Sequence, residues 1–204
     1  MKKNLSKYIV FSVFSIAVLD CSLFNKIQKE VEKTQTPQTL TASDGSCQVI
    51  VPGNWRTQPN LNNEATIQAH NLMGKLHIIV FRESKEDFGK KADLDFFTNS
   101  VRDNFKQMAE EAVLSEPLAI NINGYKARQF ETSGEVENTK AKYLYEIIET
   151  PKNYYQIVTW TLASRYTENK AQLSEVIDSF KEIDGGQEFN SHNSNTFNKR
   201  GISN

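Results

Sequence analysis

The sequence has little of what marks the more specialised protein classes. It contains two cysteines in 204 residues, Cys21 and Cys47, which are too few for a disulfide framework. Its formal net charge is −1; three lysines against Asp20 give residues 1–21 a charge of +2, which leaves −3 for the remainder. A mildly acidic body lacks the electrostatic footprint of a nucleic-acid-binding protein, so we expect no nucleic-acid partner.

Motifs that carry chemistry are also missing. There is no Gly-x-Ser-x-Gly nucleophile motif, and the glycines of residues 44–184 stand singly rather than in a phosphate-binding loop before a helix. Cys47 is one conceivable nucleophile, but its place at the head of an apolar strand is typical of a small buried side chain. Because no pairing of a nucleophile with a base is visible, we expect a protein that is not an enzyme. The sequence does not identify a cofactor.

The N-terminus predicts export. Lys2, Lys3 and Lys7 precede an uncharged, largely apolar run of twelve residues at 8–19. A basic segment followed by an apolar segment of roughly 7–15 residues is the layout of a secretory signal. The run is too short to span a bilayer as a helix, which takes about 20 apolar residues.

Cys21 directly follows this run, and the arrangement resembles a bacterial lipoprotein signal, in which the cysteine is lipidated after cleavage. Val18 and Leu19 fit that pattern, whereas Asp20 departs from it, because a small residue usually precedes the cysteine. The alternatives are an uncleaved anchor reaching Phe24 or ordinary cleavage nearby. We expect a lipoprotein anchored through Cys21 and facing the periplasm, the lumen or the cell exterior.

Composition divides the remainder into three parts. Residues 22–43 become rich in Thr, Gln and Pro and are expected to form a flexible tether. Residues 44–184 contain most of the apolar positions and are expected to form one domain. Residues 185–204 are rich in Asn, Ser and Gly and are expected to be a disordered tail.

The first half of the domain alternates strands with one helix. Strands are predicted over 46–51, 64–71 and 75–82, and Trp55 is expected in the core. Asp93 is placed to cap a helix, since its carboxylate can accept free first-turn amides. The buried stripe of that helix is predicted to be Leu94, Phe97, Val101, Phe105, Met108 and Ala112.

The second half begins with a hairpin at Asn123-Gly124, whose strand ends at Gly134 before a polar loop at 135–139. Two strands rich in aromatic and β-branched residues follow, at 143–150 and 154–163, joined by a turn at 151–153. After Arg165 the apolar period changes from two to about 3.6, which predicts a helix. The apolar face of that helix is Leu173, Val176, Ile177 and Phe180.

Five segments, in order, carry a likeness to a known family: Val-Pro-Gly-x-Trp (51–55), Asn-Gly-Tyr-x-Ala-Arg-x-Phe (123–130), a Tyr-x-x-Glu strand, Val-Thr-Trp-Thr-Leu-Ala (158–163) and Leu-x-x-Val-Ile-x-Ser-Phe (173–180). Together they resemble the PsbP-like superfamily over residues 46–182. The resemblance implies an α+β fold, in which an antiparallel sheet of about six to seven strands is flanked by helices on both faces. It also implies an exported, often lipid-anchored accessory protein without enzymatic activity.

His70 and His77 are the candidate metal ligands. They flank Met73-Gly74, and a two-residue turn there would place the two side chains opposite each other on adjacent strands. Two imidazoles could bind zinc or copper if a carboxylate or thiolate joined them. The simpler interpretation is a pair of solvent-facing histidines, since neither belongs to a metal-binding motif.

The aromatic residues Tyr143, Tyr145, Tyr155 and Trp160 are candidates for a partner-binding surface, because Tyr and Trp are enriched at interface hot spots. Packing within the sheet is the simpler interpretation. The sequence thus predicts a non-catalytic accessory or binding module for a membrane-associated protein complex, tethered by lipid on Cys21. The alternative is a small-ligand or metal-binding lipoprotein of the periplasm.

Overall fold

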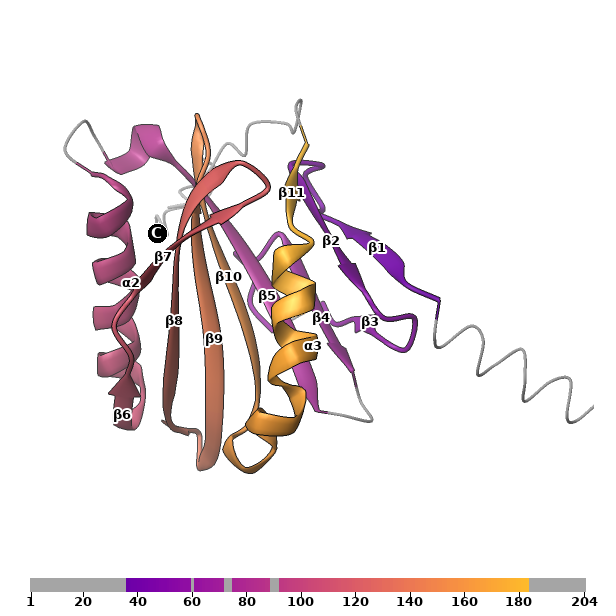
Figure 1. The fold of residues 1–204 in the computed structure, drawn as a ribbon, viewed down its shortest axis with the longest axis vertical. Helices are drawn as coiled ribbons and strands as arrows, with labels where there is room; N and C mark the ends of the chain where they lie inside the picture. Colours follow the sequence, from indigo (N-terminus) through magenta and orange to yellow (C-terminus); the bar gives the residue numbers. More distant parts are fainter. Residues whose placement is uncertain (1–35, 60, 72–74, 89–91, 184–204) are drawn as a thin grey trace, which may run out of the picture. The chain divides into compact units, whose positions relative to one another are not determined.

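The computed structural model describes residues 36–59, 61–71, 75–88 and 92–183 (Figure 1). Gln38–Val51 and the described residues from Trp55 onward belong to one compact unit; of the other unit, only 36–37 and 52–54 are described. The predicted signal with Cys21 and the predicted tail at 185–204 lie outside the described residues. No helix in the described ranges is long and apolar enough to cross a membrane.

A large antiparallel sheet forms the centre of the unit. Its eight strands run in the order β3-β4-β5-β10-β9-β8-β6, with β7 also paired to β8. The strands are β3 (Arg56–Thr57), β4 (Ile67–Asn71), β5 (Leu76–Ser84), β6 (Glu110–Leu114), β7 (Leu118–Ile122), β8 (Tyr125–Val136), β9 (Thr139–Glu149) and β10 (Asn153–Leu162). The sheet has eight strands rather than the predicted six to seven. The very short β3 adds one strand at the edge, and β6 and β7 are two separate strands that pair with successive halves of β8.

A second sheet of three strands contains β1 (Gln38–Thr41), β2 (Cys47–Val51) and β11 (Lys181–Glu182), with β2 in the middle. The ordered domain therefore begins earlier than residue 44, inside the segment predicted to be a tether. That prediction failed at 38–41 because the segment is mostly polar, and its order comes mainly from pairing with β2, with only Leu40 packed against the core.

Two helices cover the large sheet, α2 (Leu94–Met108) and α3 (Tyr166–Asp178), with short 3₁₀ turns η1 (Lys85–Phe88) and η2 (Ala163–Arg165). The Asp93 carboxylate accepts a hydrogen bond from the Phe96 amide at 2.8 Å, which confirms the predicted cap. The helix ends at Met108, because Ala109 has extended backbone angles. Met108 is 57% exposed, and Ala112 lies in β6, so the predicted apolar stripe was too long.

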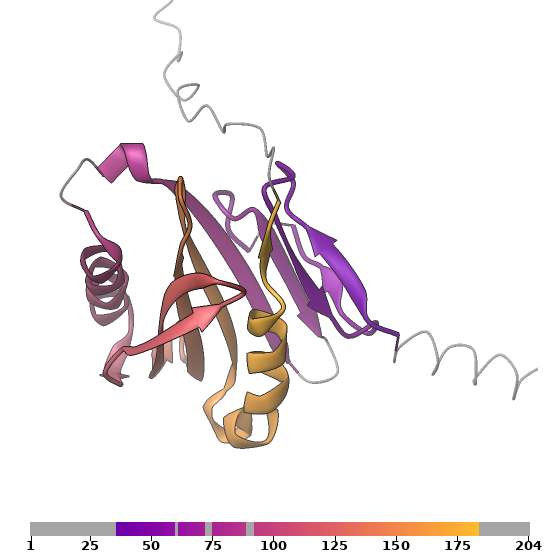
Figure 2. The ribbon, with the colours of Figure 1, turned by 45° about the horizontal axis from the view of Figure 1, so that its top comes forward.

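Alternation along the strands creates two separate cores. Leu144 and Ile148 of β9 pack with α3 and β2, whereas Tyr145 and Ile147 of the same strand pack with α2. The two helices thus lie on opposite faces of the sheet, as Figures 1 and 2 show. Trp55 is fully buried in the core beneath α3, as predicted. The predicted α+β class with helices on both faces is confirmed.

The hairpin turns follow the local chemistry of the chain. Asn123 and Gly124 both have positive φ, 49° and 92°, as a two-residue type I′ turn requires. Glu137 and Asn138 also have positive φ, 49° and 60°. The segment 135–139, predicted as a loop, therefore contains a tight turn at 137–138. The residues on either side of this turn belong to β8 and β9, so both strands are longer than expected.

Gly134 marks a close approach between β8 and the start of β6. A Cβ atom built on it would lie 2.9 Å from Cβ of Ala109 and 3.0 Å from the Glu110 carbonyl oxygen. We expect Gly134→Ala to destabilise the domain by about 1–3 kcal/mol, because backbone or a packed methyl group would have to move. Urea denaturation measures the change, with Ser133→Ala on the same strand as the matched control. An unchanged unfolding midpoint for Gly134→Ala would contradict the close approach.

Candidate functional site: a row of rings across four strands

Strand register places four ring-bearing side chains side by side on the face of the sheet that α2 covers in part. His70 of β4 is paired with His77 of β5, His77 with Trp160 of β10, and Trp160 with Tyr143 of β9. These four residues are called the ring row below. The predicted opposition of His70 and His77 is confirmed, although the Met73-Gly74 turn itself lies outside the described residues.

The rings of the row are in contact. Ring centroids are 6.0 Å apart for His70 and His77, 4.8 Å for His77 and Trp160, and 6.0 Å for Trp160 and Tyr143. The His77 and Trp160 planes differ by 10°, which is a stacked arrangement. At the other end, Tyr143 meets the ring of Phe105 from α2 nearly edge-on.

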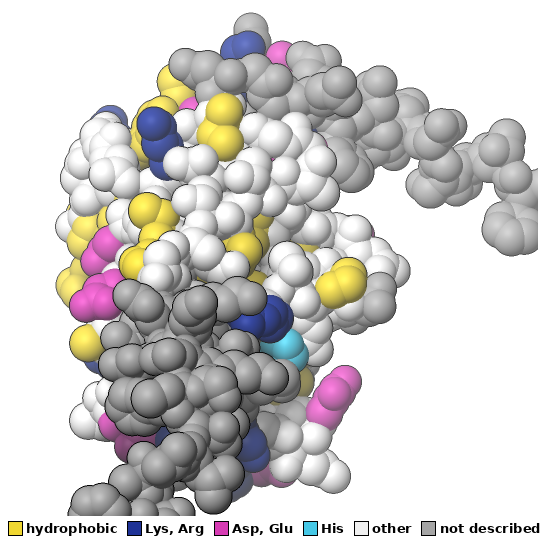
Figure 3. Space-filling view, turned by 90° about the vertical axis from the view of Figure 1, so that its right-hand side faces the viewer, with side chains coloured by type: hydrophobic (Ala, Val, Ile, Leu, Met, Phe, Trp, Pro, Cys, Tyr) yellow, Lys and Arg dark blue, Asp and Glu magenta, His cyan; other side chains and the backbone are white. Residues whose placement is uncertain are grey.

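Each ring of the row is half-buried, so the row is both fixed and accessible. The helix α2 packs mainly over β6, β8 and β9 and leaves the β4–β5 end of this face less covered. In Figure 3 a histidine side chain reaches the surface beside a basic side chain, and the only described histidines are His70 and His77. The row can therefore be reached by a ligand or a partner.

The electrostatic state of His77 follows from its packing. Partial burial, followed by the neighbouring His70, lowers the pKa of His77 to about 4. The imidazole is therefore uncharged at neutral pH. Among the described residues, its buried Nδ1 atom has no hydrogen-bond partner. In the same ranges, no group of three or more His, Cys, Asp or Glu side chains is placed to hold one metal ion.

The four predicted partner-binding aromatic residues occupy different environments. Tyr155 is fully buried on the α3 face, and Tyr145 is buried on the α2 face, stacked on Phe130 with centroids 4.9 Å apart. Of the four, only Tyr143 and Trp160 are half-buried and can be reached by a partner. Tyr155 lies in the α3 core, and Tyr145, on the same face as Tyr143, is covered by α2.

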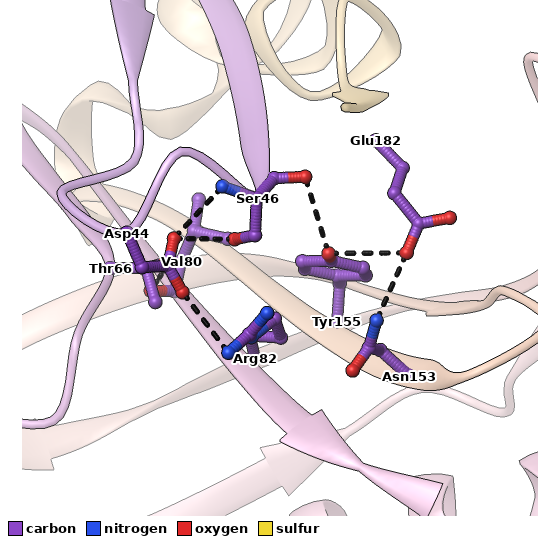
Figure 4. A network of polar contacts seen from close by, with 8 residues as sticks. All are labelled: Asp44, Ser46, Thr66, Val80, Arg82, Asn153, Tyr155 and Glu182. Carbon is purple, nitrogen blue, oxygen red and sulfur yellow. Dashed lines mark hydrogen bonds and ion pairs between the residues drawn. The ribbon is translucent and has the colours of Figure 1, made fainter. Parts of the chain in front are cut away.

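A second cluster, drawn in Figure 4, is polar and lies where the small sheet meets the large one. Asp44 accepts hydrogen bonds from the backbone amide and hydroxyl of Ser46, at 3.0 and 2.6 Å. Its other carboxylate oxygen forms an ion pair with Arg82 of β5 at 3.3 Å, and the two side chains are only 3% and 12% exposed. This contact joins the β1–β2 turn to the large sheet.

Glu182 of β11 completes the cluster. One of its carboxylate oxygens accepts hydrogen bonds from the Thr150 hydroxyl at 2.9 Å, the Asn153 amide at 3.1 Å and the Tyr155 hydroxyl at 3.2 Å. These bonds fix the last strand of the domain to the β9–β10 hairpin. Since the groups of this cluster bind one another, we assign it a structural role rather than a binding role.

Cys47 lies next to this cluster and is fully buried as a free thiol. Burial raises its pKa to about 12, so it carries no thiolate at neutral pH. The thiolate is the nucleophilic and metal-binding form of cysteine. Cys47 is therefore a packing residue, as its position in the strand predicts.

Glu146 of β9 is a feature that sequence reasoning missed. It is fully buried on the α3 face, where one carboxylate oxygen accepts a hydrogen bond from the Gln129 amide at 2.5 Å. Its other oxygen has no hydrogen-bond partner among the described residues. Burial raises the pKa of this carboxyl to about 7. The sequence did contain a sign of this burial. Glu146 lies two residues from both Leu144 and Ile148, so in a strand it shares their apolar face.

Comparison with known proteins gives no match at the level of sequence families: no family model and no curated protein sequence matches the chain. Two solved structures are similar in fold. Cyanobacterial PsbP (CyanoP) from Synechocystis aligns with a TM-score of 0.53 and 16% identity, over 72% of this chain and 93% of that one. LpqN of Mycobacterium tuberculosis, described as involved in cell envelope biogenesis, aligns with a TM-score of 0.54 and 12% identity, over 72% and 91%.

The architecture is thus that of an α+β domain in which one antiparallel sheet separates two helices. More particularly, the domain has the PsbP-like fold, as the order of the sequence motifs predicts. At these identities the likeness concerns the fold, so the roles of individual residues rest on the geometry described above.

The buried Glu146 predicts a pH-dependent stability. Its folded pKa of about 7 lies above the ordinary value of 4.5, so the folded state holds the proton more tightly than the unfolded state. The free energy of unfolding should fall as the pH rises from about 4.5 to 7, by about 3 kcal/mol from this group, and level off above. Glu146→Gln should flatten this dependence and raise stability at pH 8, as measured by urea denaturation across the pH range.

The matched control is Glu116→Gln, whose side chain is 88% exposed. This control should keep the slope of the unmodified protein. If Glu146→Gln kept the same slope as well, the proton would be held elsewhere.

Proposed function

We propose that this protein is an exported, membrane-tethered, non-catalytic binding module that serves a protein complex at the membrane. In this proposal, lipid on Cys21 holds the domain at the bilayer, and the ring row contacts the partner. The signal-like segment before Cys21 and the polar stretch that follows it support the tether. A place in the cell envelope is supported by the fold, since LpqN, described as involved in cell envelope biogenesis, has a similar fold.

The observation that carries the proposal is the half-exposed position of Trp160 and Tyr143 in the ring row. Large aromatic side chains in contact with one another lose little conformational entropy on binding and contribute large contact areas. The stacking of Trp160 on His77 fixes its ring before any partner arrives. A non-catalytic role is supported by Cys47, which is buried with a pKa of about 12 and therefore carries no thiolate at neutral pH.

The tether is tested by the change Cys21→Ala. We expect the variant protein to leave washed membranes and enter the soluble fraction, because the acceptor of the lipid is gone. Ser22→Ala, the neighbouring change, should leave the protein in the membrane fraction. Fractionation followed by immunoblotting measures both. If the Cys21→Ala protein stayed on the membrane, the lipid tether would be contradicted and an uncleaved N-terminal anchor would be indicated instead.

The partner surface is tested by affinity purification from gently solubilised membranes of the natural host, read by mass spectrometry. Trp160→Ala and Tyr143→Ala should each reduce recovery of a stoichiometric partner by at least about tenfold, the effect of roughly 1.4 kcal/mol at a hot spot. Val113→Ala is the control, since Val113 is apolar and 65% exposed at the edge of the sheet, outside the row. Equal recovery of the partner with all three variants would show that the partner does not bind at Trp160 and Tyr143.

A further inference from the structure

The β4–β5 end of the ring row has a chemistry that protein contact does not require. Two imidazoles, His70 and His77, face each other on adjacent antiparallel strands. Their rings are tilted by 47° rather than stacked. Imidazole nitrogen is a ligand suited to zinc, copper and nickel.

The spacing of the two rings is close to that of two imidazoles that share one ion. Metal–nitrogen bonds are about 2.0–2.1 Å long, so two imidazoles on a tetrahedral ion have centroids about 5 Å apart. The observed centroid separation is 6.0 Å, and a rotation of the His70 side chain closes the difference while His77 stays stacked on Trp160. No hydrogen bond of the described chain has to be broken at Nδ1 of His77, which has no partner there.

The surroundings hold the pair in place. Trp160 stacks on the ring of His77 and restricts its rotation, so less conformational entropy is lost when an ion binds. Arg56, which is paired with His70 on the other side, donates a hydrogen bond from its guanidinium to the Trp55 carbonyl at 2.7 Å. That bond directs at least one guanidinium nitrogen toward the backbone.

We propose that His70 and His77 form a binding site for one late transition-metal ion of the Cu²⁺, Zn²⁺ and Ni²⁺ class. The described residues supply two protein ligands, and the remaining coordination positions are held by water or by a group from outside the domain. Such a site is open rather than closed, unlike a structural zinc site with four protein ligands. Copper binds more tightly than zinc or nickel, in the general order for nitrogen ligands.

The inference does not rest on the lipid tether or on the protein partner, and its test is separate from theirs. Full-length protein in detergent is titrated with Zn²⁺ by calorimetry and with Cu²⁺ by tryptophan fluorescence. We expect one ion per chain and strong quenching by Cu²⁺, because Trp160 is stacked on a ligand. Trp160→Phe should remove most of the quenching, since Trp55 is fully buried in the other core.

Two variants remove one ligand each. His70→Gln and His77→Phe should each weaken ion binding by at least about tenfold, because the second imidazole binds intramolecularly. His77→Phe keeps an aromatic ring for Trp160 to stack on, so its effect reports the lost nitrogen rather than lost packing. Circular dichroism verifies that both variants are folded. The control is His192→Gln, a change of the third histidine in the chain, which should bind as the unmodified protein does.

Three results would overturn the proposal. The first is an absence of zinc binding up to about 1 mM, the range of the weakest physiological metal sites. The second is unchanged binding when His70→Gln and His77→Phe are combined. The third is loss of binding in His192→Gln, which would place the ion on the C-terminal segment. None of these results would alter recovery of a partner through Trp160 and Tyr143.

Discussion

The pairing of β10 with β9 on one side and β5 on the other is the constraint on which the rest of the structure depends. The three strands share an uninterrupted register from Tyr154 to Trp160, so every side chain along them has a fixed face and fixed neighbours. Because β10 is covered on both faces, its alternation decides which residues enter the α2 core and which enter the α3 core.

The two faces of this sheet are covered to different extents. The α3 face is covered by the helix and by the small sheet, which the contacts of Glu182 and Asp44 hold against the large sheet. Even the carboxylate of Glu146 is buried on this face. On the α2 face, the helix packs mainly toward the β6–β9 side, and the ring row continues beyond it to His70. The half-buried end of the ring row therefore lies on the α2 face, next to the packed core of that face.

The aromatic residues show where sequence reasoning stopped. Period-two alternation places Tyr143 and Tyr145 on the face opposite Leu144 and Ile148, as in the structure. The short turn between two strands correctly set His70 against His77. Alternation names a face but does not say how far a helix extends over it, so Tyr145 and Trp160 looked equivalent although one is buried and the other half-exposed. Tyr155 was placed with them although it belongs to the opposite core.

The sequence by itself determined the α+β class, the order of the central strands and the two helices, the cap at Asp93, the turn at Asn123-Gly124 and the opposition of the two histidines. These depend on periodicity and local backbone preference, which act over a few residues. Only the tertiary structure decided that the polar segment 38–41 is a strand, that Glu146 is buried, and that His77, Trp160 and Tyr143 form one row. Each of those depends on which strand lies beside which, and strand neighbours are set by packing between segments far apart in the chain.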